Sequence, residues 1–76
     1  LHGRGTATLQ VRRRQRVRVT LYNVLGQRVA TLLDRVLAPG RRHPITVRAA
    51  SLSSGSYFLR VRGADFATSR RVVVTR

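Results

Sequence analysis

The sequence predicts an all-β domain, a small antiparallel β-sandwich of about five to seven strands. Short runs of alternating apolar and polar residues recur along the chain, turn signals separate them, and no run has the length and period of an ordinary helix. With 76 residues the chain makes one domain with a thin core, because a chain of this size buries only about 60% of the surface that it exposes when unfolded. Residues 1–5 are expected to be a linker or tail, and residues 6–76 the folded domain.

A first strand is expected at residues 6–12, where alternate positions place three apolar side chains on one face: Ala7, Leu9 and Val11. Residues 12–15 are polar enough to turn but contain neither glycine nor proline, so one long bent strand is the alternative. In a continuous strand the outward face would carry a ladder of guanidinium groups that repel one another, from Arg12, Arg14, Arg16 and Arg18.

A β-hairpin from Val17 to Leu33 is the centre of the chain. The alternation of its first strand predicts an inward face of Val17, Val19 and Leu21, and an outward face of Arg16, Arg18, Thr20 and Tyr22. Asn23 to Gly26 forms the tight connection, since glycine can adopt the positive φ that valine or leucine resists. Residues 28–33 then make the return strand.

Residues 34–42 are expected to cross between the sheets as a loop, because they contain the turn signal Pro39-Gly40, with Val36 or Leu37 beneath the loop. Residues 43–48 read as a strand with Ile45 and Val47 inward, and Pro44 favours an edge position.

The last two strands are expected at residues 56–62 and 66–76, joined by a turn at residues 63–65. Gly55 lets the backbone bend before the first of them. Its alternation predicts Tyr57, Leu59 and Val61 on the inward face, and Phe58, Arg60 and Arg62 on the other. In the closing strand Val72 and Val74 are expected to point inward, and Arg71 and Val73 outward. Phe58 is interpreted as a contact with the second sheet. The alternative is an exposed ring beside Arg60 and Arg62, as in proteins that bind single-stranded nucleic acid.

The charge is unusual, because sixteen arginines face only two aspartates, with no lysine and no glutamate, for a formal net charge of +14. The choice of arginine over lysine is interpreted as codon bias or adaptation of the source, whereas the scarcity of acids acts on partners. Arginine pairs bidentately with phosphate or carboxylate, so lipopolysaccharide, nucleic acid or an acidic protein are candidate partners. The candidate anion-binding residues are Arg12, Arg14, Arg16, Arg18, Arg60 and Arg62. A solvated outer face without a dedicated partner is the simpler interpretation.

No catalytic, cofactor-binding or metal-binding residues are predicted. Asp34 and Asp65 stand beside turn residues and are interpreted as turn formers, which leaves no carboxylate pair for acid and base chemistry. A catalytic triad of Ser53 or Ser54 with His43 and an aspartate is not predicted, because Leu52 stands where a nucleophile elbow needs glycine. Two histidines and no cysteine are too few for a metal site of normal ligand count.

Three segments resemble the type A C-terminal sorting domain of proteins exported by the type IX secretion system: Leu21–Val29, Leu52–Phe58 and Arg71–Arg76. In that family the hairpin reads as aliphatic-Tyr-Asp-x-x-Gly-Arg-x-Val, the second motif as Leu-x-x-Gly-x-Tyr, and the end as an apolar strand closed by a basic residue. The sorting-motif residues assigned by this resemblance are Tyr22, Asn23, Gly26, Val29, Leu52, Gly55, Tyr57, Val72, Val74 and Arg76. Asn23 replaces the usual Asp, and the common Pro-Asn-Pro-type opening is missing, so the first strand is expected to be absent or different.

The resemblance implies an immunoglobulin-like sandwich, of a kind also found in flagellar hook-capping proteins, and a non-catalytic targeting role without a cofactor. It implies that outer-membrane translocon components recognise the domain, that an attached N-terminal cargo passes through the periplasm to the cell surface or extracellular space, and that a sortase-like peptidase often removes the domain. The missing initiator Met suggests a fragment or processed piece. The alternative, from the charge, is a basic β-module that binds nucleic acid or another polyanion.

Overall fold

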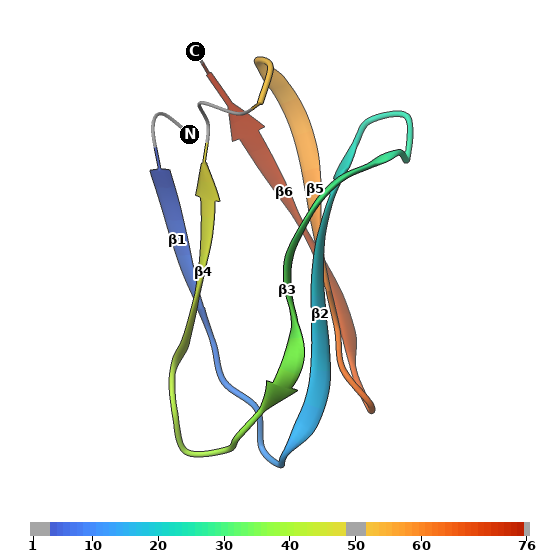
Figure 1. Cartoon of the computed structure of the whole chain (residues 1–76). Coiled ribbons are helices and arrows are strands. Elements are labelled where there is room, and N and C mark those ends of the chain that lie inside the picture. The colour runs from blue at the N-terminus through green and yellow to red at the C-terminus, as the bar shows by residue number, and fades with distance from the viewer. Residues whose placement is uncertain (1–3, 49–51, 76) are drawn as a thin grey trace.

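The computed structural model describes residues 4–48 and 52–75, which form six β-strands in two antiparallel sheets (Figure 1). The strands are β1 (Arg4–Leu9), β2 (Gln15–Asn23), β3 (Arg28–Leu37), β4 (His43–Arg48), β5 (Gly55–Arg62) and β6 (Ala67–Val74). β1 pairs with β4, and the other four strands form a sheet in the order β3-β2-β5-β6. The described chain is therefore the predicted small antiparallel β-sandwich.

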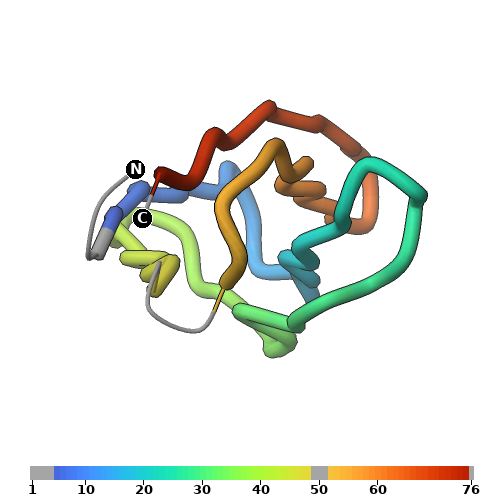
Figure 2. Tube along the Cα trace, turned by 90° about the horizontal axis from the view of Figure 1, so that it is seen from above, coloured from blue at the N-terminus to red at the C-terminus, as the bar shows by residue number. Residues whose placement is uncertain are grey.

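The core lies between the two sheets. Figures 1 and 2 place β1 and β4 on one side of the molecule and β2, β3 and β5 on the other, while the end of β6 extends towards the side of β1. The two inner strands of the four-stranded sheet, β2 and β5, supply most of the core side chains. β4 of the other sheet contributes two buried apolar side chains that face them. The buried apolar residues are Val11, Val17, Val19, Leu21, Leu37, Ile45, Val47, Tyr57, Leu59, Val61 and Val74. Each such side chain of valine or leucine size stabilises the fold by about 1.5 to 3 kcal/mol relative to its exposed state.

The predicted alternation of the inner strands is confirmed with one exception. In β5 the inward residues are buried and the outward ones exposed, and β2 follows the same rule up to Val19. Thr20, expected to face solvent, is only 3% exposed. Because β2 is an inner strand, neighbours on both sides, Thr31 in β3 and Arg60 in β5, flank Thr20. On an inner strand, the neighbouring strands can thus bury a short side chain even on the outer face of the sheet.

The hairpin is longer than predicted. β3 continues to Leu37, so residues 34–37, expected to form a loop, pair instead with β2, and the crossing loop is residues 38–42. Leu37 is buried as one of the two expected residues, whereas Val36 is half exposed. Asp34 lies within β3 opposite Arg18, so the interpretation of Asp34 as a turn former is wrong. The attraction between this carboxylate and arginines of β2 favours continued pairing of the two strands.

The first strand is present and separate from the second. β1 begins at Arg4, two residues before the predicted start, and pairs with β4, while β2 belongs to the other sheet. The alternative of one long bent strand is therefore wrong. Val11 is buried and Leu9 partly buried, as expected. Ala7 lies opposite the buried Ile45 on the expected face but is exposed, because β1 is an edge strand and the alanine side chain is short.

The closing hairpin agrees with the prediction. A backbone hydrogen bond of 2.9 Å from the Gly63 N–H to the Phe66 carbonyl oxygen closes the turn, and β6 begins at the next residue. Val74 is buried and Val72 packs against the core, whereas Val73 is half exposed. β6 therefore turns alternate valines inward, as the sequence predicts.

Candidate recognition site

The three sorting-motif segments meet at one end of the four-stranded sheet. Asn23 in β2 lies opposite Tyr57 in β5, and Tyr57 lies opposite Val72 in β6, so one residue from each motif stands in a single row across three adjacent strands. Gly55 and Val74 form a further pair between the second and third motifs. In Figure 1 this is the upper end, where the β2–β3 turn, the start of β5 and the end of β6 lie. The topology thus gathers residues that are far apart in sequence.

Asn23 builds the hairpin turn with both its side chain and its backbone. Its Oδ1 accepts hydrogen bonds from the backbone N–H groups of Leu25 and Gln27, both at 3.0 Å, and its Nδ2 donates to Gln27 Oε1 at 2.9 Å. The Gly26 N–H donates to the Asn23 carbonyl oxygen at 3.0 Å, and Gly26 adopts a φ of 81°. An aspartate can accept the same two N–H bonds, so asparagine replaces the usual residue without loss of the turn.

This turn holds apolar side chains out in solvent. Val24 is 66% and Leu25 78% exposed at the tip of the hairpin. Val29, a sorting-motif residue on the return strand, is also half exposed, and Tyr22 is partly buried. The first motif therefore enters the core through Leu21 at its start and fixes the shape of an exposed hairpin with its remaining residues.

The second motif ties the chain to the core. Tyr57 is 7% exposed, and its hydroxyl donates a hydrogen bond of 2.7 Å to the Ser53 carbonyl oxygen. Leu52 packs against the core as a partly buried side chain. Gly55 has a φ of 152°, which L-residues rarely adopt, while a Cβ there would meet nothing within 4 Å. Glycine is needed at this position for the backbone conformation and not for space.

The third motif supplies Val72 and Val74, described above, while Arg76 lies outside the described residues. The role of each sorting-motif residue in recognition remains a prediction. The sequence did not predict Ser53 as the hydrogen-bond partner of Tyr57, because the acceptor is a backbone carbonyl, which every residue type has.

Four of the six candidate anion-binding arginines share one surface. Alternation in β2 and β5 turns Arg16, Arg18, Arg60 and Arg62 to the outer face of the four-stranded sheet, and all four are exposed. Arg12 and Arg14 lie instead in the connection between β1 and β2, so the ladder that a continuous strand would carry does not form. The chain changes sheets between residues 9 and 15, which breaks the shared parity of the ladder.

Asp34 organises part of this arginine surface. One carboxylate oxygen accepts a hydrogen bond from Arg16 Nε at 3.0 Å, and the other lies 3.3 Å from an Arg18 guanidinium nitrogen. The hydrogen bond from Arg16, together with the positive charges of both arginines, lowers the pKa of Asp34 below the usual value of an aspartate. Asp65 meanwhile lies in the predicted turn and forms an ion pair of 2.8 Å with Arg13.

Phe58 is not a contact with the second sheet. It is 42% exposed on the outer face of β5 and lies opposite Tyr22 of β2. The interpretation from sequence is wrong because its neighbours Tyr57 and Leu59 already occupy the inward face. The outer face therefore carries two adjacent aromatic rings beside its arginines.

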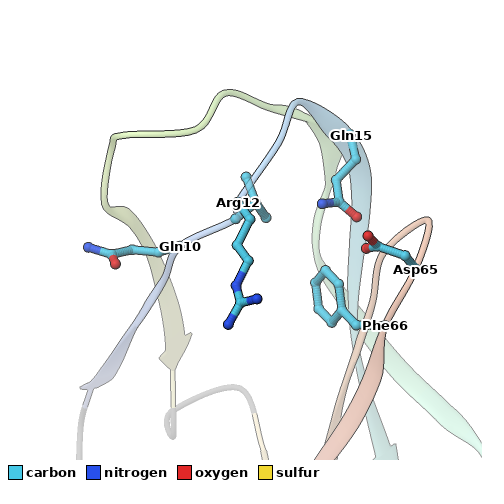
Figure 3. Close-up of a pocket in the computed structure, with 6 residues that line it drawn as sticks. Gln10, Arg12, Gln15, Asp65 and Phe66 are labelled. Carbon is cyan, nitrogen blue, oxygen red and sulfur yellow. The ribbon is translucent and has the colours of Figure 1, made fainter.

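A hollow of about 320 Å³ opens at the other end of the molecule, near the β1–β2 connection (Figure 3). It is lined by Gln10, Val11, Arg12, Gln15, Asp65 and Phe66. Gln15 is buried and stabilises the fold, because its Oε1 accepts a hydrogen bond of 2.9 Å from the Ala64 N–H. His43 is similarly buried, with Nε2 3.0 Å from the Ala38 carbonyl oxygen. Within residues 4–48 and 52–75 no three potential metal-binding side chains of His, Cys, Asp or Glu type gather in one place.

No helix among the described residues is long and apolar enough to cross a membrane.

Comparison with known proteins agrees with the motif geometry. No curated protein and no solved structure showed significant similarity to the chain. A family model described as a secretion system C-terminal sorting domain matches residues 4–75, which is nearly the whole chain. The chain therefore belongs to the family of type IX secretion C-terminal sorting domains.

Proposed function

We propose that the domain is a non-catalytic address that is read in its folded form. Members of this family are sorting signals attached to a cargo protein, and they lead it through the type IX machinery to the cell surface or the extracellular space. In our proposal, translocon components at the outer membrane bind the domain as it arrives from the periplasm. A sortase-like peptidase then removes it and anchors the cargo to lipopolysaccharide.

One observation supports recognition of the fold over recognition of a linear peptide. The three motif segments converge in one row through Asn23, Tyr57 and Val72, which only the folded sheet brings together. Two of these motifs serve chain geometry, through the Asn23 turn and the Tyr57 hydrogen bond. A receptor that reads the exposed hairpin at this end therefore needs the core beneath it to be intact.

Export of a reporter tests this proposal. The chain is fused behind a periplasmic reporter in a bacterium that has the type IX system, with a known sorting domain as the positive reference. We expect the reporter at the cell surface. Retention of this fusion in the periplasm, while the reference domain carries the same reporter out, would show that the export assignment is wrong.

A matched pair of variants separates fold from local charge. Val74 is 2% exposed and Val73 is 49% exposed, so Val74→Asp buries a charge whereas Val73→Asp places it in solvent. We expect Val74→Asp to abolish export and Val73→Asp to retain it. Equal export of both variants, with Val74→Asp shown to be unfolded, would mean that a linear signal is sufficient.

A further inference from the structure

We propose that the outer face of the four-stranded sheet binds a phosphorylated glycan, with arginines holding phosphate and an aromatic pair holding a sugar ring. By outer face we mean the side of β2 and β5 that points away from the β1–β4 sheet. The side chains of β2 and β5 that matter here are Arg16, Arg18, Tyr22, Phe58, Arg60 and Arg62.

The phosphate end of this face is a hollow of about 250 Å³ whose lining includes Arg16, Arg18, Arg62 and Asp34. Arg18 and Arg62 lie directly opposite each other on neighbouring strands, an arrangement in which like charges repel. Asp34 contacts Arg16 and Arg18 and forms no ion pair with Arg62, so the hollow keeps an excess of positive charge. A phosphate bound there relieves the repulsion and accepts bidentate hydrogen bonds from guanidinium groups.

The sugar end is a second hollow of about 340 Å³, lined by Tyr22 and Phe58 together with Arg60 and residues of the hairpin turn. The two aromatic residues are direct cross-strand partners. The negative face of an aromatic ring attracts the C–H groups on the flat side of a sugar, while the phenol and guanidinium provide polar contacts to its hydroxyls.

The spacing of the two hollows limits the ligand. The Arg18–Arg62 pair and the Tyr22–Phe58 pair are four residues apart along both strands, which is about 13 Å. Arg60 lies between them on β5 and extends the positive charge from one hollow to the other. An oligosaccharide with phosphate substituents spans this distance, whereas a single phosphate or a single sugar engages only one end.

Two alternatives fit less well. Arg35, Arg41 and Arg42 line another hollow, of about 300 Å³, but its lining contains no phenylalanine or tyrosine. Single-stranded nucleic acid would also match arginines and rings. In the proposed function, however, the domain is released at the outer membrane as the cargo is anchored to lipopolysaccharide, which is a phosphate-bearing glycan. The choice of glycan over nucleic acid therefore rests on the proposed function.

Calorimetric titration tests the proposal. The probe is the water-soluble oligosaccharide of de-acylated lipopolysaccharide, with its phosphates, and the same oligosaccharide after dephosphorylation. We expect the double variant Arg60→Gln/Arg62→Gln to weaken binding about tenfold, because it removes Arg62 from the phosphate hollow and Arg60 from the sugar hollow. The matched control Arg12→Gln/Arg14→Gln removes the same charge from the β1–β2 connection and should change affinity by about twofold or less.

A third variant separates the sugar contact from the phosphate contact. Phe58→Ala should weaken binding of the phosphorylated oligosaccharide but leave binding of inorganic triphosphate unchanged. The melting temperature of every variant is compared with wild type, and Arg62→Gln alone replaces the double variant if the latter does not fold.

The proposal would be overturned by no measurable binding by the wild-type chain, by equal losses in the two double variants, by unchanged affinity after dephosphorylation, or by tighter binding to an oligothymidine of similar charge. A loss confined to Arg41→Gln/Arg42→Gln would place the site in the other arginine hollow and would also contradict it.

Discussion

The hydroxyl of Tyr57 donates a hydrogen bond of 2.7 Å to the carbonyl oxygen of Ser53, four residues earlier in the chain. The ring of this tyrosine is part of the core, and its hydroxyl holds the segment that leads into β5. One side chain thus joins the core to the second sorting motif, and its two contributions can be measured separately.

We expect Tyr57→Phe to reduce the free energy of unfolding by about 1 kcal/mol, since it removes the hydrogen bond and keeps the ring. Tyr57→Ala should cost about 3 to 5 kcal/mol, because it also leaves a cavity. Denaturant unfolding measures both changes, and Phe58→Ala on the exposed side is the control. A Tyr57→Ala domain as stable as that control would show that the ring does not support the core.

Asn23 should tolerate aspartate and not alanine. Asn23→Asp keeps the two bonds accepted from the Leu25 and Gln27 N–H groups, whereas Asn23→Ala removes both. We expect Asn23→Ala to cost about 1 kcal/mol of stability, and the amide protons of these two residues to exchange faster with solvent. Equal exchange rates in the alanine and aspartate variants would contradict the role of the side chain in the turn.

Gly63 has no room for a side chain. A Cβ there would overlap the ring of Phe66 and would lie 2.6 Å from Gln15 Oε1. We expect Gly63→Ala to destabilise the domain by about 1 to 3 kcal/mol, as overpacking does. The same change in a Phe66→Leu background should cost less, and a double-mutant cycle without any coupling between the two positions would rule out this explanation.

Asp34 should make stability depend on pH in acid. Its pKa is lowered in the folded domain, so the unfolded chain binds a proton more readily, and stability rises with pH until the unfolded carboxyl, with a pKa of about 4, is fully ionised at about pH 5 to 6. Above this range the contribution is complete, and it is lost as pH falls through the folded pKa. Melting temperatures of wild type and Asp34→Asn should therefore differ at neutral pH and converge in acid.

Salt provides the control for this pair. Because the Asp34 ion pairs are exposed, added salt should reduce the difference between the two proteins at neutral pH. A difference that persists unchanged in strong acid would show that the asparagine acts through shape and not through charge.

Sequence alone determined the number and approximate positions of the strands, apart from the bounds of β1 and residues 34–37 of β3, and which faces of β2, β4 and β5 are buried. Alternation has a period of two, so the positions of Val17, Ile45 and Tyr57 follow from local pattern and do not depend on strand order. The turn at Asn23 and Gly26 could also be predicted, because a positive φ of glycine is a local property of the chain. The sorting motifs are also local residue patterns, so the sequence was sufficient to identify the family.

Tertiary structure decided which of these residues meet. Counting outward from the turn places Arg18 opposite Leu32, but two register shifts in the hairpin bring it opposite Asp34 and create the ion pairs with Arg16 and Arg18. The change of sheet before Gln15 removed Arg12 and Arg14 from the arginine surface, and strand order placed Phe58 beside Tyr22. Bulges, sheet changes and strand order depend on contacts between distant parts of the chain, and local periodicity carries no information about them.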